Sequence, residues 1–416
     1  MTMLTTLPLD EALDVYFQRG QDVLADPYAM YARLRSEDPV HRRDRPATYY
    51  IITCYDYVAE VLQNPLFSSN RDYAGTITAM IDRLPDSQRS QGRAIQQIVK
   101  QMVLSSDGAT HTFLRRLLRE VISSLSVDQM RGPTEQIVKE ILDPLVEYGE
   151  MEVLTDFAGP FAAHVIMGLL GVPVADRNML RKWADDILHF FDGTRGVDIA
   201  YPSMLAIDDY LKNLADERRR QPTKDLVSAL MVAEKQGDQL RWEEILANIL
   251  NLIFAGYETV AALIGNGLLA LLHYPDQLRL LRDNPNLMGS AIEEMIRYDG
   301  PDQGTLRVAT EDCIIGDKEI LAGQSVSLWL GAANHDPAHF PAPDRLDIAR
   351  TENRHLGFGH GGHYCLGVGF ARMEARVAFT ALLEGVSDIS LDTHQLEWKE
   401  NLTLRSLKAL PVRIHR

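Results

Sequence analysis

Apolar residues recur at helical spacing along most of this sequence. Positions three and four apart are apolar in many segments, so each segment would turn one apolar face toward a core. These segments are Pro27–Ser36, His111–Ser124, Val127–Gly149, Arg177–Phe191, Tyr201–Gln221, Leu226–Lys235, Trp242–Leu272, Gly289–Tyr298 and Leu366–Leu383. The pattern predicts that helices make up most of the fold.

Strand patterns are few and short by comparison. Ala47–Cys54 is rich in β-branched and aromatic residues, and Leu306–Ala309 and Ser325–Leu330 are shorter candidates. Gly316–Lys318 is typical of a turn. The sequence therefore predicts a mainly α fold with a small antiparallel β part.

The segment Ser68–Ser106 is long and mixed in composition, and we expect one or two short helices in it. Long irregular segments of compact proteins often form lids or binding loops, although a plain surface loop is the alternative. No repeat, low-complexity run or Pro-rich or Gly/Ser-rich linker divides the sequence. We therefore expect residues 1–416 to form a single domain.

One segment, Leu246–Leu272, has the length of a membrane span and contains a single charge, Glu258. It is either a lone transmembrane helix or a helix buried inside a soluble protein. The buried helix is favoured, because a Glu in the middle of a membrane is costly and amphipathic sequence lies on both sides. The N-terminal residues lack the basic and apolar regions of a signal peptide, so we expect no membrane association.

Composition narrows the function classes. Apolar residues make up 46% and charged residues 24%, as in soluble globular proteins. The 42 basic and 58 acidic residues give a net charge of −16, which disfavours general nucleic-acid binding. The three cysteines, Cys54, Cys313 and Cys365, are far apart and form no CxxC pair. This usage predicts neither a disulfide framework nor the usual structural zinc site, and it suits a reducing cytoplasm.

Candidate chemistry concentrates in His355–Glu374, where six glycines surround Cys365. Glycines at this density let the backbone turn tightly and approach a flat ligand closely. A helical pattern follows Cys365, and amides at a helix N-terminus stabilise a thiolate. From the residues alone, Cys365 is a metal-binding thiolate, a buried structural cysteine, a catalytic nucleophile, or a zinc ligand together with His360 and His363.

The stretch FGHGGHYCLG, Phe358–Gly367, resembles the haem-binding loop F-G-x-G-x-H-x-C-x-G of the cytochrome P450 family. The resemblance implies a cytochrome P450 fold and a haem b (iron protoporphyrin IX) cofactor. It implies that Cys365 is the axial thiolate ligand of the iron and that Phe358 packs beside the sulfur. It further implies that His363 reaches a haem propionate and that Gly367 completes the cofactor-binding loop.

Glu294 and Arg297 face each other on one predicted helix, a spacing that alone is typical of solvated surface charges. In the cytochrome P450 family, E-x-x-R is a buried structural pair that a downstream arginine joins, and Arg345 resembles that arginine. We expect the same helix to begin with a capping box formed by Ser290 and Glu293.

Three further basic residues match haem contacts of the family. His111 and Arg115 resemble its H-x-x-x-R motif, in which both side chains contact propionates, and Arg307 resembles a third propionate contact. Cations paired with carboxylates in a dry site form strong, oriented hydrogen bonds. A solvated surface base is the alternative for each residue taken singly.

Ala255–Thr259, AGYET, resembles the family's A-G-x-[DE]-T segment, which crosses the distal face of the haem. The resemblance implies that Gly256 opens the helix locally for oxygen, that Thr259 donates a hydrogen bond during dioxygen activation, and that Glu258 delivers protons. A Glu in an apolar helix needs a partner or a raised pKa, and either suits a proton relay. The alternative is a Glu258 salt-bridged away from the haem.

The resemblance implies a monooxygenase that uses dioxygen and two electrons to hydroxylate or epoxidise a small, mainly apolar organic substrate. Peroxygenases and oxidative coupling enzymes of the same family are alternatives, and a haem-based sensor is the non-enzymatic one. Glu258 and Thr259 favour the oxygen-activating enzyme, because a sensor needs no proton relay. The electron donor implied is a ferredoxin or flavodoxin with its reductase, and we expect Arg116, Arg119 and Arg372 to help dock it.

The resemblance also places the substrate pocket, although it does not identify the substrate. The segments expected to line it are Ser68–Ser106, Leu188–Leu205, Ala255–Thr259, Asp302–Thr305 and Leu402–Leu404. Their apolar members, which include Tyr73 and Phe191, suggest a terpenoid, polyketide, steroid or fatty acid. We expect a cytoplasmic monomer that binds neither nucleic acid nor membranes.

Overall fold

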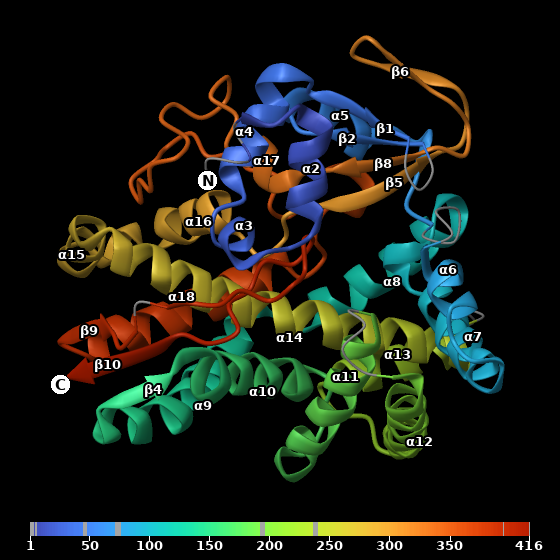
Figure 1. Ribbon diagram of the computed structural model, residues 1–416. Coiled ribbons are helices and arrows are strands. Elements are labelled where there is room, and N and C mark those ends of the chain that lie inside the picture. The colour runs from blue at the N-terminus through green and yellow to red at the C-terminus, as the bar shows by residue number, and fades with distance from the viewer. Residues whose placement is uncertain are drawn as a thin grey trace. The chain divides into compact units, whose positions relative to one another are not determined.

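The computed structural model describes residues 4, 6–44, 48–70, 76–191, 196–235, 240–393 and 395–415 (Figure 1). The chain forms two compact units, each assembled from separate stretches of sequence. Unit 1 comprises Met1–Ser68, Glu135–Phe161 and Thr259–Arg416, and unit 2 comprises Ser69–Thr134 and Ala162–Glu258. Helices dominate both units, which confirms the mainly α fold class. A single domain over residues 1–416 stays a prediction.

The described part of unit 2 contains helices and no strand. Its helices are α6 (Thr76–Asp82), α7 (Asp86–Lys100), η1 (Val103–Ser105), α8 (Gly108–Ser124), η3 (Val174–Asp176), α11 (Arg177–Phe191), α12 (Val197–Arg220) and α13 (Leu226–Lys235). We expected one or two short helices within Ser68–Ser106, and the structure has α6, α7 and the short helix η1 there. Helices α9 (Val127–Tyr148), α10 (Gly159–Leu169) and α14 (Trp242–His273) each belong partly to unit 1.

Unit 1 combines helices with all the described strands. Its helices are α2 (Leu9–Phe17), α3 (Gln21–Ala25), α4 (Tyr28–Glu37), α5 (Tyr55–Gln63), η2 (Val153–Ala158), α15 (Pro275–Asp283), η4 (Pro285–Leu287), α16 (Met288–Asp299), α17 (Leu330–Asn334), η5 (Gly361–His363) and α18 (Val368–Gly385). One apolar core lies between a five-stranded sheet and α5, and a second joins α2, α3 and α4 to Ile51 and Trp329.

Three small sheets make up the β part. The first has the order β1 (Val40–Arg43), β2 (Tyr49–Ile52), β8 (Ser325–Leu328), β5 (Thr305–Ala309) and β3 (Phe67–Ser68). The second has the order β4 (Glu150–Glu152), β10 (Pro411–His415) and β9 (Asp388–Leu391), and β6 (Cys313–Ile315) pairs with β7 (Lys318–Ile320). The pairings are antiparallel as predicted, except that β2 pairs with β8 in parallel.

The long apolar helix, α14, runs unbroken from Trp242 to His273 (Figure 1). Within the part of the chain that the structure describes, it is the one helix long and apolar enough to cross a membrane. Of its most apolar stretch, 56% is buried inside the protein. This burial supports the prediction of a core helix.

A buried charge network joins α16 to the segment that follows α17. The guanidinium of Arg297 donates to both carboxylate oxygens of Glu294 at 2.8 and 2.9 Å, and both side chains are fully buried. It also donates to the backbone oxygens of Asn334, Pro343 and Arg345. The E-x-x-R pair is therefore a buried structural pair rather than a pair of surface charges.

The downstream arginine of this network is Arg350, and the prediction of Arg345 was wrong. The side chain of Arg345 is exposed, and only its backbone oxygen contacts Arg297. The guanidinium of Arg350 lies 3.0 Å from Glu294 Oε2, and Asn353 donates to the same oxygen. Glu294 thus neutralises two arginines and holds the segment leading toward Cys365.

The predicted capping box of α16 was also wrong. The helix begins at Met288, so Ser290 lies within its first turn and donates to the backbone oxygen of Leu287. Glu293 accepts hydrogen bonds from His355 and Arg372 instead of capping the helix. The spacing matched a capping box, but the first helical turn starts earlier than the pattern indicated.

We expect Glu294→Gln to lower the free energy of unfolding by about 3–5 kcal/mol, because it leaves buried arginines with too little compensating charge. The control is Glu37→Gln in the more exposed Arg33–Glu37 pair, whose loss should cost about 1 kcal/mol or less. Urea unfolding followed by circular dichroism measures both. Equal losses for the two variants would contradict the structural role of the network.

Candidate functional site

The backbone of Phe358–Cys365 forms a compact loop that includes η5 and precedes α18. The Cys365 N–H donates to the backbone oxygen of Phe358 at 2.9 Å, so the loop closes on itself. Gly359 and Gly361 both have φ of +70°, which other residues rarely adopt. A Cβ at Gly361 would lie 2.8 Å from the backbone oxygen of Leu62. Gly361 is therefore required by both conformation and space, and Gly359 by conformation.

The thiol of Cys365 is suited to bind a metal at the face of a flat ligand. Cys365 is partly exposed and lies just before α18. Amides at the start of a helix favour a thiolate over a thiol. A Cβ at Gly367 would have no atom within 4 Å, so the protein leaves space beside Gly367 for a ligand. Among described residues, no group of three His, Cys, Asp or Glu is placed to hold a metal ion, which disfavours the zinc alternative.

Glu293 anchors both flanks of this loop, a role that sequence reasoning missed. Its carboxylate accepts from His355 Nε2 at 3.2 Å and from two nitrogens of Arg372 at 2.6 and 2.7 Å. The guanidinium of Arg372 also lies 5.0 Å from the ring centre of Phe358. The residue expected to pack beside the sulfur is thus held by a cation–π contact.

Electrostatics of Glu293 confirm that it is a charged anchor. Burial raises the pKa of Glu293, but the hydrogen bonds from His355 and Arg372 outweigh burial and lower the pKa to about 2. The folded-state pKa therefore lies below the ordinary value of 4.5. The resulting stability is fully present above about pH 4.5 and is lost as the pH falls toward 2.

The middle of α14 presents the residues expected to act on dioxygen. The helix passes Gly256 without a break, and a Cβ there would lie 3.0 Å from the side chain of Ile166 in α10. Gly256 therefore lets α10 approach closely, while a local opening for oxygen stays a prediction. Glu258 and Thr259 follow within one turn and are both partly exposed.

A second acidic residue of unit 2 lies in the electrostatic environment of Glu258. Burial raises the pKa of Asp185 in α11, although Arg181 and a hydrogen bond from Tyr257 oppose the shift. The charge of Glu258 raises the pKa of Asp185 further. Burial also raises the pKa of Tyr257, with Asp185 as the next cause, so the phenol stays protonated. Asp185 and Tyr257 form a hydrogen-bonded pair in the electrostatic environment of Glu258, and no sequence motif indicated this pair.

The expected propionate contacts come from different parts of the fold. His111 and Arg115 lie on α8 in unit 2, where His111 is buried and Arg115 half-buried. Arg307 on β5 is buried and donates to the Thr305 hydroxyl at 3.1 Å, and His363 ends η5. Their joint contact with haem stays a prediction.

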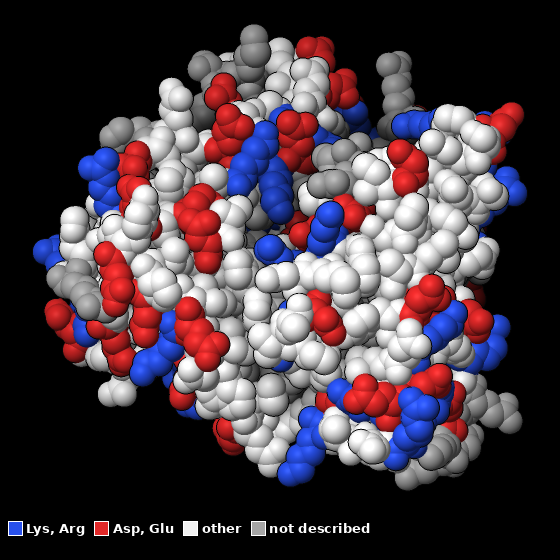
Figure 2. All heavy atoms as spheres, turned by 90° about the horizontal axis from the view of Figure 1, so that it is seen from below, with Lys and Arg blue, Asp and Glu red and all other residues white. Residues whose placement is uncertain are grey.

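The expected docking cations divide into two kinds. Arg116 and Arg119 are exposed on α8, and Arg116 also lies over the ring of Phe113. The charge of Arg372 is instead compensated by Glu293, so the main role of Arg372 is to stabilise the cysteine loop. Figure 2 shows acidic and basic side chains interspersed over one face of the molecule, without a division into separate regions of each sign.

Some segments expected to line the substrate pocket fall partly outside the described residues. Tyr73 and the side chain of Phe191 lie outside the part of the chain that the structure describes. Asp302 forms an isolated bridge with Leu404, so two of the predicted lining segments lie side by side in unit 1. The remaining assignments stay predictions.

We expect Glu293→Gln to reduce the free energy of unfolding by about 2–3 kcal/mol at about pH 7, because it removes the charge that His355 and Arg372 bind. The difference in free energy of unfolding between the variant and the native protein should stay constant down to about pH 5. It should become smaller below about pH 4.5. Urea unfolding across this range measures it, with Glu397→Gln of the exposed Lys408 pair as the control. A difference that grows as the pH falls would contradict the assignment.

Known proteins place this fold and loop in one family. The cytochrome P450 family model matches residues 203–285 and 281–387. The chain is 37% identical to cytochrome P450 monooxygenase PikC of Streptomyces venezuelae, covering 95% of this chain and 93% of PikC. It is 39% identical to cytochrome P450 CYP107DY1 of Priestia megaterium, over 86% of this chain and 88% of that protein.

A solved structure supports the same conclusion. P450BioI in complex with hexadec-9Z-enoic acid ligated acyl carrier protein matches with a TM-score of 0.85 at 34% identity, covering 95% of this chain and 100% of that chain. These similarities confirm the predicted fold and the haem b cofactor. The chain belongs to the cytochrome P450 family and is a monooxygenase of that family.

Proposed function

We propose that Cys365 is the axial thiolate ligand of haem b and that the enzyme hydroxylates or epoxidises a small, mainly apolar organic compound. The observation that carries the proposal is the closed loop Phe358–Cys365, fixed by one backbone hydrogen bond and two glycines of positive φ at the start of α18. This loop presents a partly exposed thiol where a helix dipole favours its ionised form.

The cofactor would be held by the cysteine loop and by charged residues from other segments of the chain. Phe358, Cys365 and Gly367 would contact it from the loop, and His363 would reach a propionate. His111, Arg115 and Arg307 would supply the other charged contacts to the propionates. Thiolate-ligated haem supplies the oxidising power to split dioxygen and place one oxygen atom on a substrate carbon.

The chain's own contribution to the chemistry is proton delivery and the exclusion of competing reactions. Thr259 would hold a hydrogen bond to the reacting oxygen, and Glu258 would pass protons toward it. Asp185, which accepts a hydrogen bond from Tyr257, is a further titratable group in the electrostatic environment of Glu258. Gly256 would keep room in this region, since a larger residue would displace Ile166.

The electron donor we propose is a ferredoxin or flavodoxin with its reductase, in the cytoplasm. Exposed Arg116 and Arg119 on α8 offer positive charge to such an acidic carrier. Arg372 is left out of this docking role, because Glu293 already compensates its charge. We propose that the enzyme acts as a monomer on a terpenoid, polyketide, steroid or fatty acid.

Replacing the proposed ligand should change the spectrum of the reduced, CO-bound protein. We expect Cys365→Ser to abolish the Soret position typical of thiolate ligation, because a neutral hydroxyl does not replace the thiolate charge. Cys54→Ser and Cys313→Ser are matched controls and should leave the spectrum unchanged. A thiolate spectrum retained in Cys365→Ser would refute the assignment.

Without the proposed proton donors, the enzyme should consume electrons while oxidising less substrate. We expect Thr259→Val and Glu258→Gln each to lower product formation by about 10²-fold or more and to release more peroxide per electron pair, because proton transfer slows. The CO spectrum of both variants should stay that of a thiolate enzyme. Thr112→Val on the exposed side of α8 is the control. Unchanged peroxide release and product yield would show that these residues have another role.

A further inference from the structure

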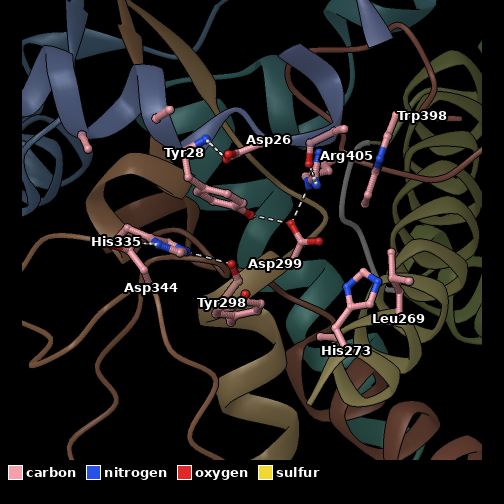
Figure 3. A pocket seen from close by; sticks show the side chains of 14 residues that line it. Asp26, Tyr28, Leu269, His273, Tyr298, Asp299, His335, Asp344, Trp398 and Arg405 are labelled. Carbon is pink, nitrogen blue, oxygen red and sulfur yellow. Dashed lines mark hydrogen bonds and ion pairs between the residues drawn. The ribbon is translucent and has the colours of Figure 1, made fainter. Parts of the chain in front are cut away.

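A second pocket in unit 1 shares no residue with the loop or with the proposed oxygen-activating segment. It encloses about 460 Å³, within the range of ordinary small-molecule sites. It lies among the start of α4, the end of α14, the end of α16 and the segment Trp398–Arg405 (Figure 3). Its lining residues are Ala25, Asp26, Tyr28, Ala29, Ala32, Leu269, Ala270, His273, Tyr298, Asp299, His335, Asp344, Trp398 and Arg405.

Asp299 occupies the centre of this pocket and has acceptor capacity to spare. Its Oδ1 accepts from the hydroxyl of Tyr28 and from Arg405 Nε. Its other oxygen accepts no hydrogen bond from any residue that the structure describes, although Asp299 is only 8% exposed. This oxygen keeps some accessible surface and belongs to a residue that lines the pocket, so it can accept a hydrogen bond from a ligand.

The charged groups of the pocket are predominantly negative. Arg405 is the one guanidinium against three carboxylates, Asp26, Asp299 and Asp344. The hydrogen bond from His335 lowers the pKa of Asp344, so this carboxylate is ionised. Arg405 has its donors directed at Asp299 and at the backbone oxygens of Leu24 and Ala25, so it offers little to an anion.

The walls are suited to a flat apolar group. Tyr28, Tyr298 and Trp398 supply aromatic surface, and four alanines and Leu269 supply small apolar surface. Several ring faces are already used, since Tyr28 stacks on His335 at 4.2 Å and Arg405 lies 3.4 Å from the centre of Trp398. These contacts fix the side chains, so the pocket already has its shape before a ligand binds.

A metal ion does not fit these observations. No three His, Cys, Asp or Glu side chains of the described residues are close enough together to coordinate one. The negative groups are instead spread over the pocket, as Figure 3 shows for Asp26, Asp299 and Asp344. The spread of negative charge therefore favours a larger cation over a metal ion.

We propose that this pocket binds an organic ammonium ion that carries a flat apolar group. The ammonium donates a hydrogen bond to the unpartnered oxygen of Asp299, and the carboxylates of Asp26 and Asp344 add favourable charge. The apolar group lies against Tyr298 and the alanines of α4. The site is separate from the proposed haem and substrate residues, and its occupant need not be oxidised.

The test is calorimetric titration of the haem-loaded, reduced, CO-bound enzyme with benzylammonium chloride. Bound CO prevents the amine from coordinating the iron, and the Soret band reports any displacement. We expect a dissociation constant on the order of 1 mM or below, ordinary for so small a ligand. Phenylmethanesulfonate, which has the same ring and the opposite charge, should show no binding.

Two variants locate the binding. Ala32→Phe places a ring in the pocket from an exposed position of α4 and should weaken binding by about 10-fold or more. Asp26→Asn retains an acceptor for the Tyr28 N–H and should weaken binding by about 3-fold, whereas Asp22→Asn on α3 should leave it unchanged. Absence of ammonium binding, equal binding by Ala32→Phe, or equal binding of the sulfonate would each overturn the proposal.

Discussion

The site depends on two adjacent carboxylates of α16. Glu294 binds Arg297 and, through Arg350 and Asn353, the segment that enters the cysteine loop. Glu293 binds His355 at the start of that loop and Arg372 in the helix that follows it. One helical turn therefore fixes both ends of the loop that carries Cys365. A glycine-rich loop has high conformational entropy when unfolded, so it needs such anchors at both ends.

The buried pair of Glu294 and Arg297 is tolerated because its hydrogen bonding is complete. A guanidinium has five N–H donors, and Arg297 directs its three nitrogens at Glu294 and at three backbone oxygens. Glu294 in turn also accepts from the backbone N–H of Asp347. Buried charges cost several kcal/mol unless they are paired and satisfied, so removing one partner destabilises more than the pair itself contributes.

The sequence predicted the elements better than it predicted their partners. Periodicity placed Arg177–Phe191 and Leu226–Lys235 at the residues where α11 and α13 begin and end. The E-x-x-R spacing identified a pair that local helix geometry alone brings together. The third member was assigned to Arg345 instead of Arg350, because which arginine reaches Glu294 depends on the path of an irregular segment. The parallel pairing of β2 with β8 joins strands far apart in sequence, which short patterns do not encode.

In the candidate site too, the sequence predicted residues within short motifs and missed contacts between distant segments. The loop motif, Glu258 and Thr259 were visible because each lies within a short run of sequence. The role of Glu293 was not, since its partners His355 and Arg372 are more than sixty positions away. Asp185 was missed for a similar reason, because its link to Tyr257 joins two different helices. Burial and contacts between segments distant in sequence, rather than motifs, shift the pKa values of Glu293 and Asp185.

The same helix that carries Thr259 also reaches the second pocket. Asn266 lies about two turns further along α14 and donates to the backbone oxygens of Asp299 and Arg405, which line that pocket. A ligand on Asp299 would therefore tighten a hydrogen-bonded connection to α14. Coupling between two sites requires an element with two arrangements, and α14 is here a continuous, well-buried helix in this region. Occupancy of the pocket should accordingly raise the stability of unit 1 more than it changes the rate of oxidation.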